Sequence, residues 1–192
     1  MYSYGLDVME ALLEKHPECE LCVVTRFQPI IEATKLIAKK FNSTMEMSEE
    51  NATLVEKHSL REASRDVQRV QVICSPESVN GISYSIKAGI LAQMNEEVPD
   101  YYLFMVSDQP YVSVETIDQL ILKTTSSNAI GGCVTWEDTL GNPVIFAKEL
   151  REELLKLQGD KGGKSILKKY DEQICKVKAG SKRELEDKDV RG

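Results

Sequence analysis

One acidic residue stands where a buried strand is expected to end. Asp108 follows the apolar run at residues 101–106 after a single serine, and it precedes Gln109-Pro110. A carboxylate at the tip of such a strand needs a metal ion, a hydrogen-bond donor or water. Mg²⁺ is commonly held by one or two carboxylates together with phosphate oxygens. Asp108 is therefore the candidate catalytic and metal-binding residue. The alternative is an aspartate that only forms the turn or cap before a helix near Ser113.

A glycine and two hydroxyls lie between an expected strand and an expected helix. They are Gly81, Ser83 and Ser85. The first N–H groups of a helix have no partner within the helix, so they can bind an anion or the acceptor atoms of a base. Ordinary capping by Ser83 explains the same residues without a ligand, and from the residues alone it is the simpler explanation.

The glycine-rich stretch at residues 158–165 imitates a phosphate-binding P-loop but fails its spacing. Five positions before Gly163 stands Gln158 instead of glycine, and a helix instead of a strand is expected to precede the stretch. Two interpretations stay open, a turn between two helices and a loop that contacts a ligand. His16 and His58 lack the nucleophile context of a serine hydrolase.

Composition narrows the class of protein. The 192 residues suit one domain, 1–192, and 42% hydrophobic residues suffice for a core. The net charge of −7 disfavours nucleic-acid binding. No membrane-length apolar run or signal-like start is evident, so a cytoplasmic protein is the default expectation. Cys19 and Cys22 form a single C-x-x-C, which we interpret as reduced, buried thiols in preference to a metal or redox site.

Apolar periodicity predicts an α/β fold with a mostly parallel sheet covered on both faces. The run at 101–106 is the expected central strand, residues 139–142 are an expected turn, and residues 42–69 are an expected exposed helical connection. In such sheets ligands bind beyond the carboxyl ends of the strands. Strands are expected over residues 20–25, 70–74, 101–106, 129–136, 143–147 and 174–177, and helices over 4–15, 29–41, 83–94, 114–123, 149–157 and 164–170.

Five segments together resemble the molybdenum cofactor cytidylyltransferases, within the MobA-like NTP transferases. The segments are G-I-S-Y-S-I-K-A-G-I from Gly81, V-S-D-Q-P from Val106, G-N-P-V-I-F from Gly141, L-Q-G-D-K-G-G-K-S-I-L from Leu157 and, more weakly, E-D-K-D from Glu186. The resemblance implies a three-layer α/β/α Rossmann-like nucleotidyltransferase fold. It also implies transfer of a cytidylyl or guanylyl group from CTP or GTP to a molybdopterin-type cofactor, with release of pyrophosphate. A molybdoenzyme or a maturation protein would be the protein partner.

The same resemblance implies roles for individual residues. Asp108 would hold Mg²⁺, with Asp189 or Asp187 as the second ligand. Gly81, Ser83, Ser85 and Asp108 would contact the nucleotide. The residues expected at the acceptor are Gly141, Asn142, Pro143, Asp160, Gly162 and Gly163.

The chain departs from the family pattern at both ends. The family begins with a strand and a glycine-rich loop, L-A-A-G-x-S-x-R-M-G, which cradles the triphosphate, whereas this sequence opens in the following helix. A missing first strand would expose apolar neighbours and weaken nucleotide binding. The tail reads D-K-D-V where the family has D-I-D-T. A catalytically degenerate nucleotide-binding or regulatory module is therefore the alternative function. A sugar-nucleotide enzyme would need D-x-D where this chain has D-Q-P.

Overall fold

A computed structural model describes residues 3–42, 69–92, 98–106 and 108–187, and it confirms an α/β fold. Most expected elements are present, and the connection expected at residues 42–69 lies almost wholly outside the described residues. The strands are β1 (Leu21–Thr25), β2 (Val70–Cys74), β3 (Tyr101–Phe104), β4 (Gly131–Trp136), β5 (Thr139–Ala147) and β6 (Ile174–Lys178). The helices are α1 (Ser3–Lys15), α2 (Gln28–Phe41), α4 (Ile82–Leu91), α5 (Val114–Ser126), α6 (Arg151–Leu155) and α7 (Lys164–Lys169), with short 3₁₀ turns at Pro76–Asn80, Lys148–Leu150, Asp171–Gln173 and Lys182–Leu185.

The strands form two sheets, and the prediction of a mostly parallel sheet is wrong. β1 and β2 pair in parallel, while the second sheet has the order β3-β5-β4-β6 and is mixed. β5 runs antiparallel to both β3 and β4, and only β4 and β6 pair in parallel there. The strand expected to be central, β3, lies at the edge of its sheet among the described strands. The sheet is mixed because β4 and β5 form a hairpin, and the two strands of a hairpin run antiparallel.

The hairpin turn is not where the sequence indicated. Residues 139–142 belong to β5, where Gly141 pairs with Val134, and the turn lies at Glu137 and Asp138. Glycine, asparagine and proline normally indicate a turn. Here Gly141 is needed for close packing, because a Cβ on it would lie 2.5 Å from the Leu185 side chain. The peptide bond before Pro143 is cis.

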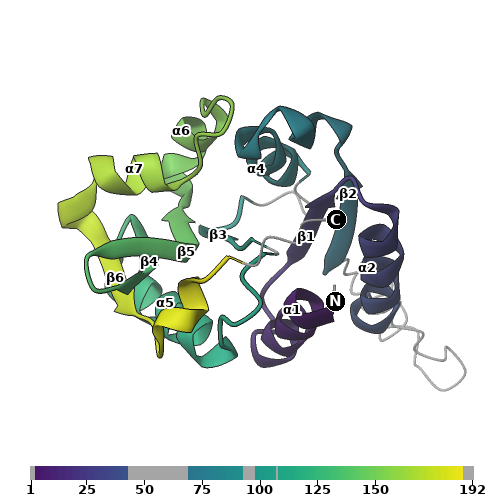
Figure 1. Cartoon of the computed structure of the whole chain (residues 1–192), viewed down its shortest axis with the longest axis horizontal. Coiled ribbons are helices and arrows are strands. Elements are labelled where there is room, and N and C mark those ends of the chain that lie inside the picture. The colour runs from purple at the N-terminus through teal and green to yellow at the C-terminus, as the bar shows by residue number, and fades with distance from the viewer. Residues whose placement is uncertain (1–2, 43–68, 93–97, 107, 188–192) are drawn as a thin grey trace, which may run out of the picture.

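Helices cover both sides of the strands, in a three-layer arrangement. In Figure 1, α1 and α5 lie below the strands, whereas α4, α6 and α7 lie above them. α2 packs against β2 at the far end of the smaller sheet. None of the helices in the described part of the chain is long and apolar enough to span a membrane.

The core of the larger sheet follows the alternation of β5. Phe146 faces α4, α6 and α7 and is fully buried, together with Leu154 and Leu167. Ile145 points to the opposite face, where it packs with Leu120 of α5. Successive strand residues point to opposite faces, so one strand supplies both halves of the core.

The connection between α1 and β1 is fixed by a half-buried arginine. The Arg69 guanidinium donates hydrogen bonds to the carbonyls of Leu13 (3.0 Å), His16 (2.9 Å) and Cys19 (3.1 Å). The His16 ring also contacts Asp118 of α5, with Nε2 3.0 Å from Oδ1. These bonds hold the end of α1 against both α5 and the start of β1.

The start of α4 packs against the glycine-rich connection. Gly81 precedes the helix with φ 126°, and a Cβ on it would lie 2.3 Å from the carbonyl carbon of Gly159. The Ser83 N–H donates to the Gly159 carbonyl over 3.1 Å. This contact joins two segments that are far apart in the sequence.

We predict that Gly81→Ala lowers the free energy of unfolding by at least about 1–3 kcal/mol, because alanine is strained at this φ and meets the Gly159 backbone. Urea unfolding followed by circular dichroism measures the change. Gly5→Ala is the matched control. Gly5 lies within α1, and a Cβ on it would meet no atom within 4 Å. That substitution should stabilise the protein by roughly 0.5–1 kcal/mol. A Gly81→Ala protein as stable as the parent would contradict the close contact.

Candidate functional site

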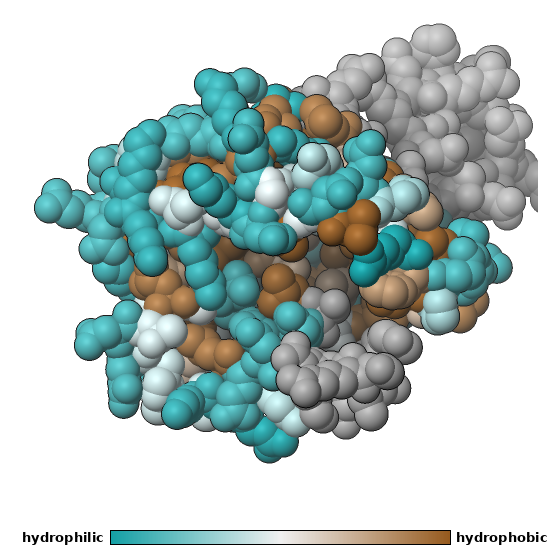
Figure 2. All heavy atoms as spheres, turned by 45° about the horizontal axis from the view of Figure 1, so that its top comes forward, coloured by the Kyte–Doolittle hydropathy of each residue, from teal (hydrophilic) through white to brown (hydrophobic). Residues whose placement is uncertain are grey.

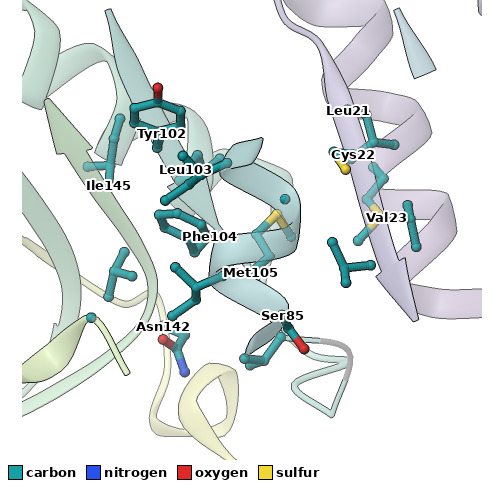
Figure 3. A pocket seen from close by; sticks show the side chains of 18 of the residues that line it. Leu21, Cys22, Val23, Ser85, Tyr102, Leu103, Phe104, Met105, Asn142 and Ile145 are labelled. Carbon is teal, nitrogen blue, oxygen red and sulfur yellow. The ribbon is translucent and has the colours of Figure 1, made fainter. Parts of the chain in front are cut away.

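An open cavity of about 2370 Å³ separates the two sheets. Its walls include β1 on one side and β3 on the other, with α1 and α4 contributing side chains (Figure 3). Figure 2 shows apolar side chains inside a recess whose rim is largely hydrophilic. The cavity therefore has an apolar middle and polar ends.

Most of the predicted site residues line this cavity, near the carboxyl ends of β1 and β3. Ser85 and Asn142 lie there, at the end toward which both strands run (Figure 3). Three predicted residues, Ser83, Gly141 and Pro143, are not among those lining the cavity. The predicted site residues that line it are Gly81, Ser85, Asp108, Asn142, Asp160, Gly162 and Gly163.

Asp108 lies on the wall of the cavity and is exposed. Of the alternative roles, that of a helix cap is wrong, whereas Asp108 does lie in a turn. Ser113 caps α5 instead, because its side-chain oxygen accepts a hydrogen bond from the Thr116 N–H over 3.2 Å. Asp108 thus lies shortly after the end of β3, among the residues that line the cavity.

The end of the described chain returns to the residue next to Asp108. The Gln109 side-chain amide donates to Asp187 Oδ1 over 2.8 Å and to the Leu185 carbonyl over 3.5 Å. Gln109 is 7% exposed, and its Oε1 has no hydrogen-bond partner among the described residues. Asp187 itself is exposed. Two carboxylates therefore belong to neighbouring segments, while Asp189 lies outside the described residues.

The predicted capping role of Ser83 is wrong. Gly81 is the residue at the helix cap, and no side-chain capping bond is present. Ser83 is fully buried, and its Oγ has no partner in the described part of the chain. Its backbone N–H donates a hydrogen bond to the Gly159 carbonyl instead. Ser83 therefore positions the loop, while Gly81 and Ser85 border the cavity.

Residues 158–165 form both a connection and a wall. They join α6 to α7, and Asp160, Gly162 and Gly163 line the cavity. A Cβ on Gly163 would lie 2.7 Å from the Phe146 ring. The glycine thus lets the loop approach the core closely. The stretch is a connection between two helices, as one interpretation had it, and its contact with a ligand stays a prediction.

Two cations on the cavity wall received no role from the sequence. Arg26 follows β1 directly, and Lys164 begins α7. The position of Arg26 after a strand was a usable signal, because such positions meet at the ligand-binding edge. Lys164 was given no role because the glycine-rich stretch that contains it does not have the spacing of a P-loop. Positive charges here can offset phosphate charge.

The cysteines and His16 lie toward the opposite end of β1. Cys19 and Cys22 are free thiols, but both are half-buried and not buried as the sequence predicted. Burial raises the pKa of both thiols, that of Cys22 to about 11, so both are protonated near neutral pH. The donor atoms of His16, Glu18 and Cys19 lie within 4.8 Å of one another. His16 already has carboxylate contacts there, which tie α1 to its surroundings.

Comparison with solved structures finds the following similarities, of which the first supports a related fold. The complex of Rv0371c with manganese from Mycobacterium tuberculosis H37Rv is 16% identical, with a TM-score of 0.50 over 83% of this chain and 88% of that chain. A 4-diphosphocytidyl-2C-methyl-D-erythritol synthase from Anaerococcus prevotii DSM 20548 is 12% identical, with a TM-score of 0.47 over 88% of this chain and 90% of that chain. An Rv0371c homologue from Mycobacterium sp. strain JC1 is 15% identical, with a TM-score of 0.46 over 69% of this chain, and only 62% of that chain is covered.

Comparison of the amino-acid sequence with known proteins and family profiles identifies the family more specifically than the fold comparison does. No curated protein matches significantly. Residues 11–174 match the family profile of the MobA-like NTP transferase domain. That span includes both walls of the cavity, Asp108 and the glycine-rich connection. Because the match covers most of the chain, this protein belongs to the MobA-like NTP transferase family.

Proposed function

We propose that this domain transfers a nucleotidyl group from a nucleoside triphosphate to a phosphate-bearing acceptor. The observation that carries the proposal is the hydrogen bond that Gln109, the residue after the cavity-lining Asp108, donates to Asp187. Membership of the NTP transferase family gives the reaction class. The cavity edge supplies acidic, cationic and hydroxyl groups within one site.

The residues at this edge fit a divalent metal ion such as Mg²⁺. Asp108 and Asp187 offer carboxylate oxygens, and the buried Gln109 Oε1 lacks a partner among the described groups. Hard divalent cations prefer oxygen ligands of this kind. One structural neighbour was solved with manganese, which shares that preference. When bound, the ion would neutralise charge on the α-phosphate as pyrophosphate leaves.

The chain's own groups would position the two substrates. Gly81 and Ser85 line the cavity at the start of α4 and would contact the nucleotide, Ser85 through its hydroxyl group. Arg26 and Lys164 would offset phosphate charge from opposite walls. An acceptor phosphate oxygen then attacks the α-phosphorus, and the bond to the β-phosphate breaks with its electron pair leaving on pyrophosphate. Positioning matters more than a base here, since the nucleophile is already ionised.

The finer assignment concerns the base and the acceptor. The sequence motifs that begin at Gly81, Val106, Gly141 and Leu157 support CTP or GTP as donor and a molybdopterin-type cofactor as acceptor. The part of the cavity available to that acceptor is lined by Asn142, Asp160, Gly162 and Gly163. Gly141 and Pro143 would act indirectly, by setting the path of β5 beside Asn142.

We predict that Asp108→Asn weakens Mg²⁺-dependent binding of CTP and GTP by at least about tenfold, the scale on which supporting metal contacts act. The amide keeps the shape but loses the charge that a divalent ion requires. Isothermal titration calorimetry with and without Mg²⁺ measures the loss.

The matched control is Asp138→Asn, in the exposed turn between β4 and β5. It should bind as the parent does. Equal binding by Asp108→Asn and the parent would refute the metal assignment. Binding without any nucleotidyl transfer, in the parent, would instead favour the regulatory module.

We also predict that Asp187→Asn raises the Mg²⁺ concentration needed for half-maximal nucleotide binding by several-fold, about 3–10 times. The asparagine oxygen can still accept the Gln109 hydrogen bond, so the tail stays in place while its charge is removed. Titration of Mg²⁺ at fixed CTP reports the change. Glu186→Gln, at the exposed neighbouring position, should leave the titration unchanged. If both variants titrate like the parent, the tail is not part of the metal site.

A further inference from the structure

Three side chains with metal-binding atoms lie together in the connection between α1 and β1. They belong to His16, Glu18 and Cys19, and their ligand atoms, one from each residue, lie within 4.8 Å of one another. This connection precedes β1, whereas the candidate transferase site lies near the carboxyl ends of the strands, so the proposed transfer reaction gives the three residues no role. An imidazole, a carboxylate and a thiol are ligands that proteins use for Zn²⁺.

The contact between the His16 ring and Asp118 determines which ring nitrogen can bind a metal ion. Nε2 of His16 lies 3.0 Å from Oδ1 of Asp118. The Lys15 ammonium donates a hydrogen bond to the other carboxylate oxygen, Oδ2, over 2.6 Å and forms an ion pair with it. An ionised carboxylate only accepts hydrogen bonds, so Nε2 must carry the proton. In a neutral ring, the free lone pair is therefore on Nδ1.

The other ring nitrogen, Nδ1 of His16, faces a second carboxylate. It lies 3.3 Å from Oε1 of Glu18, which is longer than most N–H···O hydrogen bonds. With the proton on Nε2, lone pairs of Nδ1 and Oε1 face each other, and a cation between them would remove the repulsion. A tetrahedral Zn²⁺ with bonds of about 2.0–2.2 Å separates a nitrogen and an oxygen ligand by about 3.3–3.5 Å. The observed separation therefore suits a shared metal ion.

We propose that Nδ1 of His16, the carboxylate of Glu18 and the sulfur of Cys19 form a Zn²⁺ site between α1 and β1. Cys19 is a half-buried free cysteine, so its sulfur can serve as the third ligand. The thiol releases its proton to solvent as the Zn–S bond forms, because the thiolate is the form that binds metal. Glu18 is exposed, so the ion can enter from solvent and keep a water molecule as its fourth ligand.

The backbone that carries the three ligands is held in place by the protein itself. The Cys19 N–H donates to the His16 carbonyl over 3.0 Å, which closes the turn between them. The Arg69 guanidinium donates to the carbonyls of the same two residues. Pro17 lies within the turn and restricts its backbone further. A site whose backbone is ordered before binding avoids part of the entropic cost of binding.

Asp118 orients the histidine without binding the metal. Histidines that bind metal ions almost always donate their second ring N–H to a carboxylate, a carbonyl or water, which fixes the tautomer and the ring orientation. His16 has this arrangement with Asp118, and its ring is buried at the contact between α1 and α5. The ring is thereby held with Nδ1 toward Glu18.

The ligand chemistry separates this site from the proposed Mg²⁺ site and from a cysteine pair. Thiolate and imidazole suit Zn²⁺, whereas carboxylates such as those of Asp108 and Asp187 suit Mg²⁺. Among the described residues, Cys22 is not a member of the group, although it completes the C-x-x-C with Cys19. The two thiols are therefore expected to behave differently.

A second proton on the His16 ring is the competing explanation of its contacts. A doubly protonated ring would donate to Glu18 and Asp118 at once, and no metal ion would be needed. Cys19 takes no part in that arrangement, whereas its sulfur must bind the ion in the proposed site. The state of the Cys19 sulfur in the presence of metal therefore separates the two.

The test titrates Co²⁺, a spectroscopic substitute for Zn²⁺, into the reduced full chain, with excess Mg²⁺ present to occupy the proposed transferase site. One equivalent of Co²⁺ should bind and give the near-ultraviolet charge-transfer band of a cobalt–thiolate bond, and Zn²⁺ should displace it. Cys19→Ser should abolish this band, and Glu18→Gln should weaken Co²⁺ binding by at least about tenfold. The matched controls are Cys22→Ser and Cys74→Ser, which should keep both the band and the affinity. Circular dichroism verifies that each variant is folded.

Several results would overturn the proposal. A parent protein that shows no charge-transfer band at saturating Co²⁺ would leave the doubly protonated ring as the explanation of the His16 contacts. A band that persists in Cys19→Ser, or that disappears in Cys22→Ser or Cys74→Ser, would assign the metal to another thiol. Unchanged Co²⁺ affinity in Glu18→Gln would remove the carboxylate from the ligand set. Because Mg²⁺ is present throughout, none of these results bears on the transferase site.

Discussion

The position of β5 between β3 and β4 is the constraint on which the candidate site depends. Backbone pairing with both neighbours fixes β5, and through it β3 and the Asp108 segment that follows. The same strand carries Gly141, against which Leu185 packs closely enough to exclude any side chain. Leu185 in turn lies within reach of Gln109, which binds Asp187. Through these contacts, β5 helps to place Asp108 and Asp187 in neighbouring segments.

Sequence patterns predicted the helices and strands well, because their signals are local. The apolar run after Asp100 predicted β3, and the period of residues 114–123 predicted α5. Asp108 could be selected because a charge directly after an apolar run needs a local reason. The structure places it on the cavity wall, as that reasoning required. Its role as a metal ligand stays a prediction.

The errors arose where tertiary contacts override local signals. Gly141 and Asn142 are typical of a turn, but the packing of Leu185 requires a glycine within a strand. Ser83 is typical of a cap, but Gly81 precedes the helix with a backbone angle that suits glycine. The Gln109–Asp187 bond joins residues far apart in the chain, and no local pattern could indicate it. The mixed sheet follows from the β4–β5 hairpin, whose turn lacks the glycine that usually marks one.

The candidate site lies at one end of a larger cavity between the two sheets. Charged groups and a helix N-terminus lie at the carboxyl end of the strands, while the middle is apolar. The most direct test of the transferase site is a crystal structure with Mn²⁺ and a non-hydrolysable nucleoside triphosphate, with the ion located by its anomalous signal. We expect an ion that contacts the carboxylates of both Asp108 and Asp187. An ion bound elsewhere, with Asp108 making no contact to metal or phosphate, would contradict the site proposed for this domain.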